Sequence, residues 1–297
     1  MASFKAHTIR QFLKLRAQRQ DPNQPIAQRR QELDLASEMF LMPENINIQQ
    51  VMLQNMESEW LEIPGADEHE AMLYLHGGGY TAGSCQSYRF LASQVGLACR
   101  LNVLLPEYRL APEHPFPAAV EDAVTAYHWL LASGIPPGGI VIAGDSAGGG
   151  LAMAALTRIR DTGVEMPAAA VLLSPWLDLT MSGETIKTCA EVDPSMNIAL
   201  LRRMANFYRG GTDASHPQIS PLFADLNGLP AILIQVGEDE ILLSDSTRLA
   251  ENAASAGIDI TLDIYDEMWH VWHYFGDTLP ESQQAIEKIG TFVRNKL

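Results

Sequence analysis

Cysteine is scarce in this chain, and positively charged residues are outnumbered. Only three of the 297 residues are cysteine, an odd number without the close spacing of metal ligands. This argues against both a disulfide framework and a zinc site. The chain has 20 Lys and Arg residues against 36 Asp and Glu residues, a formal net charge of −16. A nucleic-acid partner requires a basic face, so we expect no nucleic-acid binding and attribute the charge to solubility.

Long hydrophobic runs are also missing. No segment approaches the length of apolar sequence that crosses a bilayer, so we expect no membrane span. The opening stretch, MASFKAHTIRQFLKLRAQRQ, has charges throughout and lacks the apolar core of a secretory signal. Together with the few cysteines, these features favour a soluble cytoplasmic protein.

Short apolar segments alternate with helical patterns through most of the chain. The segments predicted to be strands are 71–76, 102–108, 139–145, 168–175, 231–239 and 259–267. Several are apolar on both faces, which is typical of a parallel sheet covered by helices on both sides. The alternation predicts an α/β protein with an open, doubly wound sheet, whose reactive groups lie at the carboxyl ends of the strands.

Two regions depart from this alternation. Residues 1–55 look helical without a strand, and residues 178–215 insert a helical segment between two strands. Neither resembles an independent domain. We expect both to form a helical cap over the loop face of the sheet, with residues 56–297 as the main domain and 178–215 as an insertion in it.

The sequence VIAGDSAGGG, residues 141–150, places Ser146 between Gly144 and Gly148. It follows an apolar strand and precedes a helix of small residues. In a nucleophile elbow a serine occupies such a sharp strand-to-helix turn, and glycines flank it because side chains there would clash. The turn exposes the hydroxyl at a helix N-terminus, where backbone N–H groups favour developing negative charge.

A glycine triplet, Gly77-Gly78-Gly79, follows His76 at the end of an earlier strand. Consecutive glycines leave their backbone N–H groups accessible to a bound ligand. This suits an oxyanion hole, whose donors must lie about 3 Å from the forming alkoxide. The triplet follows the strand two before the elbow strand, as an oxyanion-hole loop does in this arrangement.

A serine nucleophile requires a base, and the base requires an orienting acid. In this fold they follow the serine in the order acid, then histidine. Only His270 and His273, in YDEMWHVWHYF, lie beyond a late strand. We favour His270 because it is closer to the strand end and hence to the loop face.

Six motifs in order resemble the hormone-sensitive-lipase-like family of α/β-hydrolase carboxylesterases. They are HGGGY, PEYRLAPEHPFPAAVEDA, GDSAGG, LLSPWLDL, SPLFADLNGLP and MWHVWHYF, and the resemblance covers about residues 70–297. It implies an α/β-hydrolase fold with a helical cap, and hydrolysis of short- to medium-chain carboxylic esters without a cofactor or metal. Carried over by position, it makes Ser146 the nucleophile and His270 the general base. The oxyanion hole then consists of the N–H groups of Gly78, Gly79 and Ala147.

The acid of the triad departs from the family pattern. Many members carry Asp-Pro-Leu where this chain reads Gly237-Glu238-Asp239-Glu240-Ile241-Leu242. Aligning Leu242 with the leucine of the motif puts Glu240 at the acid position, and we prefer it to Asp239. Either carboxylate can accept the imidazole N–H.

The resemblance gives neighbouring polar residues supporting roles. We expect His76 to brace the glycine loop, Asp145 to hold backbone or an arginine, and Arg109 and Glu113 to form an internal ion pair or backbone brace.

Other functions remain open on the same residues. An amidase, peptidase, deacetylase or lactonase would use the same triad, and a non-catalytic small-molecule binder is a further alternative. The expected partner is a small-molecule ester. A homodimer is also expected, and because relatives often pair through the last strand and helix, its expected surface is residues 259–267.

Overall fold

The computed structural model describes residues 2–19 and 21–297. Its strands are β1 (Asn47–Leu53), β2 (Met56–Glu62), β3 (Ala71–Leu75), β4 (Asn102–Pro106), β5 (Ile140–Asp145), β6 (Ala169–Leu173), β7 (Ala231–Gly237) and β8 (Ile260–Tyr265). Its α-helices are α1 (Phe4–Ala17), α2 (Ile26–Ser37), α3 (Cys85–Cys99), α4 (Ala118–Ala132), α5 (Ala147–Asp161), α6 (Thr185–Thr188), α7 (Ile198–Arg209), α8 (Leu243–Ser255) and α9 (Pro280–Arg294). Short 3₁₀ segments are Pro137–Gly139, Pro221–Phe223 and Trp272–Thr278.

The eight strands form one sheet in the order β1-β2-β4-β3-β5-β6-β7-β8. Strands β3 to β8 are mutually parallel, and β2 is antiparallel to both of its neighbours. All six strands predicted from the apolar segments are present, so the prediction of an α/β fold with a mostly parallel sheet is confirmed.

The expectation that residues 1–55 contain no strand is wrong. Strand β1 pairs with β2 in a hairpin, from Asn47 opposite Glu62 to Leu53 opposite Met56. Gln54 adopts a φ of 55° in the turn. The strand was missed because it lies at the edge of the sheet and is largely exposed, so it lacks the continuous apolar run of the buried strands. The helical part of this region therefore ends before residue 47.

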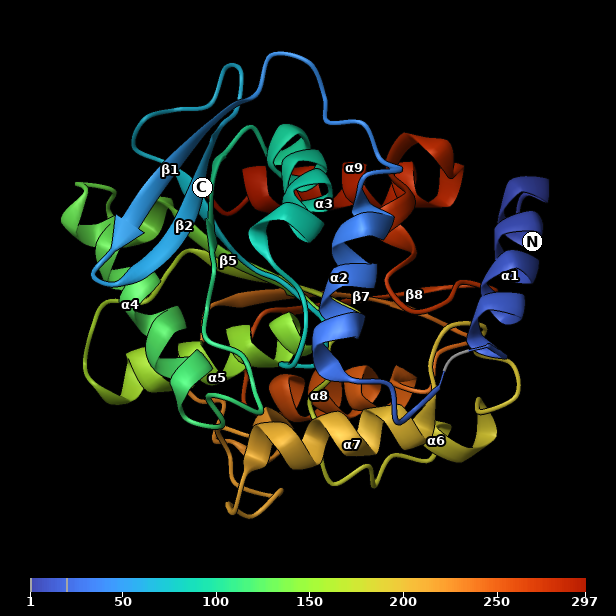
Figure 1. Ribbon diagram of the computed structural model, residues 1–297. Helices are drawn as coiled ribbons and strands as arrows, with labels where there is room; N and C mark the ends of the chain where they lie inside the picture. The colour runs from blue at the N-terminus through green and yellow to red at the C-terminus, as the bar shows by residue number, and fades with distance from the viewer. Residues whose placement is uncertain (1, 20) are drawn as a thin grey trace.

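Helices cover both faces of the sheet and enclose two apolar cores (Figure 1). Helices α3 and α9 pack on one face, and α4, α5 and α8 on the other. Alternate residues of β3 supply the two cores: Leu73 and Leu75 face the α4–α5 side, whereas Met72 and Tyr74 face α3. Burial on both faces explains why the central strands are uniformly apolar.

The helices of the two cap regions are spread around the sheet, with α2 at the centre of the view, α1 at the right and α6 and α7 along the bottom (Figure 1). Helix α2 packs against α3, and Arg203 of α7 donates to the carbonyl oxygens of Pro22 and Gln24 just before α2. Residues far apart in the sequence thus form one covering layer. No helix within residues 2–19 and 21–297 is both long and apolar enough to cross a bilayer.

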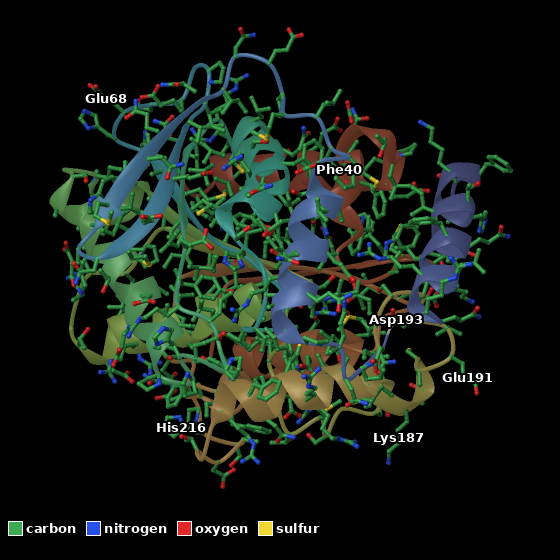
Figure 2. All side chains as sticks on the ribbon, in the orientation of Figure 1. Phe40, Glu68, Lys187, Glu191, Asp193 and His216 are labelled. Atoms are coloured by element: carbon green, nitrogen blue, oxygen red, sulfur yellow. The ribbon has the colours of Figure 1, made fainter. Side chains whose placement is uncertain are left out.

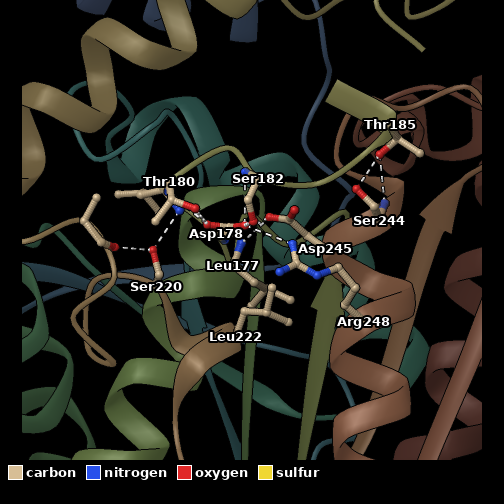
Figure 3. A network of polar contacts seen from close by, with 12 residues as sticks. Leu177, Asp178, Thr180, Ser182, Thr185, Ser220, Leu222, Ser244, Asp245 and Arg248 are labelled. Atoms are coloured by element: carbon tan, nitrogen blue, oxygen red, sulfur yellow. Dashed lines mark hydrogen bonds and ion pairs between the residues drawn. The ribbon is translucent and has the colours of Figure 1, made fainter. Parts of the chain in front are cut away.

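A buried polar network anchors the start of the second cap region to α8 (Figure 3). Asp245 accepts hydrogen bonds from the backbone N–H groups of Leu177 and Asp178. The fully buried carboxylate of Asp178 in turn pairs with Arg248 at 2.9 Å. Hydrogen bonds from Thr180 and Ser182 complete the shell of Asp178. The chain that leaves β6 is therefore held rigidly where it enters the cap.

Candidate active site

The bend at Ser146 joins the end of β5 to the start of α5. Ser146 has φ 52° and ψ −121°, a conformation that is unusual for a residue with a side chain. A Cβ at Gly148 would lie 1.9 Å from the carbonyl oxygen of Leu75, and one at Gly144 would lie 2.4 Å from that of Gly148. Neither flanking position can carry a side chain, which is the reason anticipated for the glycines.

Three predicted residues from distant parts of the chain meet above this bend. The Nε2 atom of His270 lies 2.9 Å from the Oγ atom of Ser146. The Nδ1 atom of the same ring lies 3.0 Å from Oε2 of Glu240. Glu240 is fully buried, and the side chain of His270 is 10% exposed. The imidazole is therefore held between a carboxylate and a hydroxyl, an arrangement that can take a proton from the hydroxyl.

Glu240 is positioned by groups beyond the imidazole. Its Oε1 atom accepts hydrogen bonds from the Ser174 hydroxyl and from the backbone N–H of Gly237, both at 2.6 Å. Ser174 also accepts a hydrogen bond from the N–H of Val271, the residue after the histidine. Ser174, which the sequence analysis did not single out, thus links the loops of the acid and the histidine.

Asp239 occupies a different environment from its neighbour Glu240. Its carboxylate forms an ion pair with Arg10 of α1 at 2.5 Å, and its side chain is 24% exposed. The two adjacent carboxylates point to different partners, and the one that reaches His270 is the glutamate.

The environment of His270 raises its pKa above 6.5. Burial alone would lower the pKa, because it disfavours the charged ring. The hydrogen bond and the charge of Glu240 outweigh this effect, and Asp193 and Asp145 act in the same direction. The site therefore favours the imidazolium that forms when the ring accepts a proton.

The glycine loop lies on the other side of the serine. Gly78 and Gly79 have φ values of 105° and 68°, in a region that glycine adopts without strain. Both line the same cavity as Ser146 and His270. Within the described residues, the N–H groups of Gly78, Gly79 and Ala147 donate to no other protein group. Three N–H donors near the hydroxyl are what an oxyanion hole requires.

Two further histidines are structural. His76 is buried and stacks on Tyr108 at 4.2 Å between ring centroids, while its Nδ1 atom lies 2.8 Å from the carbonyl oxygen of Gly77. His273 lies 2.9 Å from Oε1 of Gln235. Burial lowers the pKa of His76 to about 4 and of His273 to about 3. Both rings are neutral at pH 7, and neither contacts Ser146.

Asp145 supports the glycine loop, as expected for backbone bracing. Its Oδ1 atom accepts hydrogen bonds from the N–H of Gly77 and the hydroxyl of Tyr74, at 3.0 and 3.1 Å. Burial raises the pKa of this carboxyl to about 7.

The expected ion pair between Arg109 and Glu113 is not formed. Arg109 pairs with Asp122, to which its backbone N–H also donates, whereas Glu113 pairs with Arg30 of α2. The two residues are close in sequence but contact different helices. Arg109 therefore braces the start of α4, and Glu113 holds the cap.

A cavity of about 250 Å³ opens above Ser146 and His270. Its walls come mainly from the cap: Phe12 and Leu13 of α1, Leu33 of α2, and Leu201 and Met204 of α7. A Cβ at Gly79 would lie 2.3 Å from Sδ of Met204, so the loop and α7 are in close contact. The cavity can enclose a small apolar group beside the hydroxyl.

The cap also reaches the acid loop through Asp193, which lies beside α1 in the loop after α6 (Figure 2). Its Oδ2 atom accepts a hydrogen bond from the N–H of Ile241, the residue after Glu240, at 3.0 Å. Its Oδ1 atom accepts from the N–H of Ser195 at 2.9 Å. This contact was not predicted, because nothing in the local sequence relates Asp193 to residue 241.

No group of three or more His, Cys, Asp or Glu side chains suited to a metal ion occurs in residues 2–19 and 21–297. Cys85, near the glycine loop, is buried and its thiol donates to the carbonyl oxygen of Leu105. Burial raises the pKa of this thiol, so it is a packed side chain rather than a nucleophile.

Comparison with known proteins agrees with the fold. Residues 72–274 match a family model described as the α/β-hydrolase fold. The chain is 44% identical to an acetyl-hydrolase of Streptomyces hygroscopicus over 99% of this chain and 97% of the relative. It is 34% identical to an esterase of Acinetobacter venetianus over 88% and 86%. Among solved structures, an esterase from the bacterial hormone-sensitive lipase family has a TM-score of 0.95 and 42% identity, covering 100% of this chain and 99% of that one.

The fold and these relatives define a carboxylic ester hydrolase of the α/β-hydrolase class. Within that class, the chain belongs to the hormone-sensitive-lipase-like family, as the six sequence motifs indicated.

Proposed function

We propose that the protein hydrolyses short- to medium-chain carboxylic esters through an acyl-enzyme on Ser146. His270 is the general base, Glu240 orients it, and the N–H groups of Gly78, Gly79 and Ala147 form the oxyanion hole. The observation that carries the proposal is the continuous contact from Glu240 through His270 to Ser146, at 3.0 and 2.9 Å, beside the cavity.

The reaction proceeds in two acyl transfers. His270 takes the proton of Ser146 as Oγ attacks the ester carbonyl, and the negative charge of the tetrahedral intermediate is held by the three N–H groups. His270 then gives the proton to the leaving alcohol as the C–O bond breaks. Water, activated by the same histidine, attacks the acyl-enzyme and releases the acid.

Two measurements test the assignment of the nucleophile. Ser146→Ala is expected to lower the kcat for p-nitrophenyl butyrate by at least roughly 10⁴-fold, because no other group can form the acyl-enzyme. An organophosphate should label the wild-type protein at Ser146, located by mass spectrometry of peptides. Ser195→Ala, which removes another hydroxyl of the cavity, should still take up the label. Labelling at a different residue would contradict the proposal.

The size of the cavity and the name of one relative favour the short end of the acyl series. The cavity of about 250 Å³ is bounded by Met204 and Leu201, and a relative covering nearly the whole chain is an acetyl-hydrolase. In a series of esters from acetate to laurate, kcat/KM is expected to be highest for an acyl chain no longer than butyrate to hexanoate. Acetamides matched to the acetate esters separate an amidase or deacetylase from an esterase, and a lactone tests the third alternative.

We also propose that two copies pair through the exposed edge of β8. This strand is at one end of the sheet, and its Ile264 is 49% exposed. Light scattering of Ile264→Lys beside the wild type tests the homodimer: a wild-type mass of one chain excludes it. The cytoplasmic location stays a prediction, to be checked by cell fractionation.

A further inference from the structure

Two arginines of the cap line the cavity without a protein partner. Arg29 comes from α2 and Arg16 from α1, and both are lining residues of the cavity that contains Ser146. The Nε atom of Arg29 is buried and has no hydrogen-bond acceptor. Within residues 2–19 and 21–297, neither guanidinium forms a hydrogen bond, an ion pair or a ring contact. Arg16 is exposed to solvent, whereas Arg29 is partly buried, and a buried polar atom such as its Nε is usually hydrogen-bonded, so its position in the cavity wall requires an explanation.

Other arginines of the cap differ in this respect. Arg10 pairs with Asp239, Arg30 pairs with Glu113, and Arg203 donates to the carbonyl oxygens of Pro22 and Gln24. These three fix the cap to the rest of the protein. Arg16 and Arg29 have no such contact; among the described residues of the cap Arg19 and Arg202 also lack one, but of these four only Arg16 and Arg29 line the cavity that contains Ser146.

The groups around Arg29 leave its charge largely uncompensated. The pKa of its guanidinium is lowered, mainly by burial and then by the positive charges of Arg16 and Arg203. Tyr88 and Glu32 oppose this effect, but Glu32 is exposed and already accepts hydrogen bonds from two glutamine side chains. Within the described residues, no carboxylate forms an ion pair with Arg29 on this wall of the cavity.

One acidic side chain, Asp145, is among the lining residues of the cavity. Its Oδ1 atom is occupied by Tyr74 and Gly77, and burial raises its pKa to about 7. It pairs with neither arginine. The positive charges on the cap side therefore remain available to a ligand.

Positively charged residues are also concentrated in the first part of the sequence, which supplies Arg16 and Arg29. Residues 1–30, which include α1 and the first part of α2, contain seven of the 20 Lys and Arg residues and one of the 36 Asp and Glu residues. The remainder of the chain carries the large negative excess. A local positive excess in the N-terminal segment of an otherwise acidic protein favours the approach of anions to the wall of the cavity that this segment forms.

We propose that the substrate is an ester carrying a second, ionised acidic group, which Arg29 binds with the help of Arg16 while the ester carbonyl lies at Ser146. The inference rests on the proposed function of Ser146. A guanidinium in a partly dry cavity suits this role, because its planar donors bind carboxylate or phosphate oxygens in pairs. Tyr88 also lines the cavity, and its hydroxyl can donate a further hydrogen bond to the anion, whereas the Ser195 hydroxyl already donates to Asp193.

The test compares esters that differ only in charge, on either side of the ester bond. Monomethyl glutarate is paired with methyl pentanoate for a charge on the acyl side, and 3-acetoxypropanoate with propyl acetate for a charge on the alcohol side. Acid release in a pH-stat gives kcat/KM for all four. The ratio of kcat/KM between the charged and neutral ester is the readout.

In at least one pair, Arg29→Met is expected to lower this ratio at least tenfold, because it removes the charge while keeping most of the apolar length. Arg29→Lys should retain part of the ratio, and Arg16→Met should lower it less than Arg29→Met. Lys14→Met makes the same change of charge on α1 without facing the cavity, and should change the ratio less than threefold. In the wild type, 0.5 M NaCl should lower the ratio.

Equal ratios in wild type and Arg29→Met for both pairs would overturn the proposal, provided that the variant melts cooperatively. If Arg29→Met does not fold, the proposal would be overturned when the ratio of kcat/KM between charged and neutral ester is equal in Arg16→Met and in the wild type for both pairs. A loss in Lys14→Met as large as in Arg29→Met would assign the effect to overall charge. Hydrolysis of p-nitrophenyl butyrate, and its loss in Ser146→Ala, is measured in parallel. No hydrolysis by the wild type, or unchanged hydrolysis by Ser146→Ala, would reject the proposed function rather than this inference.

Discussion

The loop face of the sheet and the cap above it are built in different ways. On the loop face, Glu240 is held by Ser174, by the N–H of Gly237 and by His270 at 2.6–3.0 Å, all on short chains leaving buried strands. In the cap, long arginine side chains make several of the polar attachments. Chemistry that needs fixed distances is thus carried by the rigid scaffold, and the cavity shape by the less constrained cap.

The exposure of apolar side chains also differs between the cap and the sheet. Of ten exposed large apolar side chains among the described residues, six lie in the first 41 residues: Phe4, Phe12, Leu15, Leu35, Met39 and Leu41. The sheet strands β3, β5 and β6 are by contrast completely buried. The cap therefore gains less stabilisation from packing than the sheet does. Changes in the scaffold should affect turnover, and changes in the cap should affect substrate binding.

The adjacent carboxylates Glu240 and Asp239 test this comparison most strongly, since Glu240 contacts the histidine of the scaffold and Asp239 contacts Arg10 of the cap. Glu240→Gln is expected to lower kcat by roughly 10⁴-fold, because the imidazole loses its orienting acceptor. Asp239→Asn removes only the ion pair with Arg10 and should change kcat less than about threefold. Steady-state assays of the two variants decide the assignment. The reverse order of effects would transfer the role of acid to Asp239.

The pH profile of the same pair provides an independent readout. His270 must be neutral to act as a base, and its pKa is raised above 6.5, so kcat/KM of the wild type should fall as the pH drops through that raised value. Removing the charge of Glu240 leaves burial as the main influence, so the acid limb should move to lower pH. An unchanged limb in Glu240→Gln would show that this carboxylate does not control the histidine.

Ser174→Ala is expected to have the next largest effect. The hydroxyl donates to Glu240 and accepts from the N–H of Val271, so its loss removes one of the two donors to Oε1 of Glu240 and leaves the N–H of Val271 without its acceptor near the histidine. A cost of about 1–3 kcal/mol for an unsatisfied buried group corresponds to a roughly 5- to 150-fold fall in kcat, if it is felt mainly in the transition state. Ser182→Ala, which removes a donor from the buried carboxylate of Asp178, is the matched control. It should lower the melting temperature but leave kcat within about twofold.

Arg30→Met is expected to have the smallest effect on turnover and to act on binding. Arg30 ties α2, a wall of the cavity, to the carbonyl oxygens of Thr81 and Ala111 and to Glu113. Its loss should raise KM by roughly three- to tenfold, from about 1 kcal/mol of lost wall positioning, while kcat changes less than twofold. Arg160→Met, which loses comparable bonds to the carbonyl oxygens of Asp225 and Asn227 outside the cap, should leave KM unchanged. A fall in kcat larger than the rise in KM would contradict the division between scaffold and cap.

The sequence predicts those parts of the molecule whose signal is local. The six buried strands appear as apolar runs, and the bend at Ser146 appears as a serine between two glycines that steric contact requires. The order of acid and histidine along the chain restricts their candidates to a few residues. These features need no knowledge of how distant segments pack.

The features that escaped prediction depend on long-range packing. Ser174 lies 66 residues from Glu240, and Asp193 lies 48 residues from Ile241. A hydroxyl directly after a buried parallel strand was the available signal for Ser174, since such ends converge on one edge of the sheet. Arg109 and Glu113 form ion pairs with other partners rather than with each other, and Arg109 also braces backbone through the carbonyl oxygen of Ala118, because residues close in sequence here contact different helices. Strand β1 was missed because an exposed edge strand has little apolar pattern.

The backbone angles of Ser146 have a further consequence for how such a protein evolves. Glycine tolerates a φ of 52° better than serine does, so a chain selected for folding alone would carry glycine at this position. The hydroxyl is thus retained against thermodynamic preference, and the cost is borne by the surrounding fold. If catalysis were no longer selected, the serine could be replaced by glycine, and the resulting relative would be more stable but inactive.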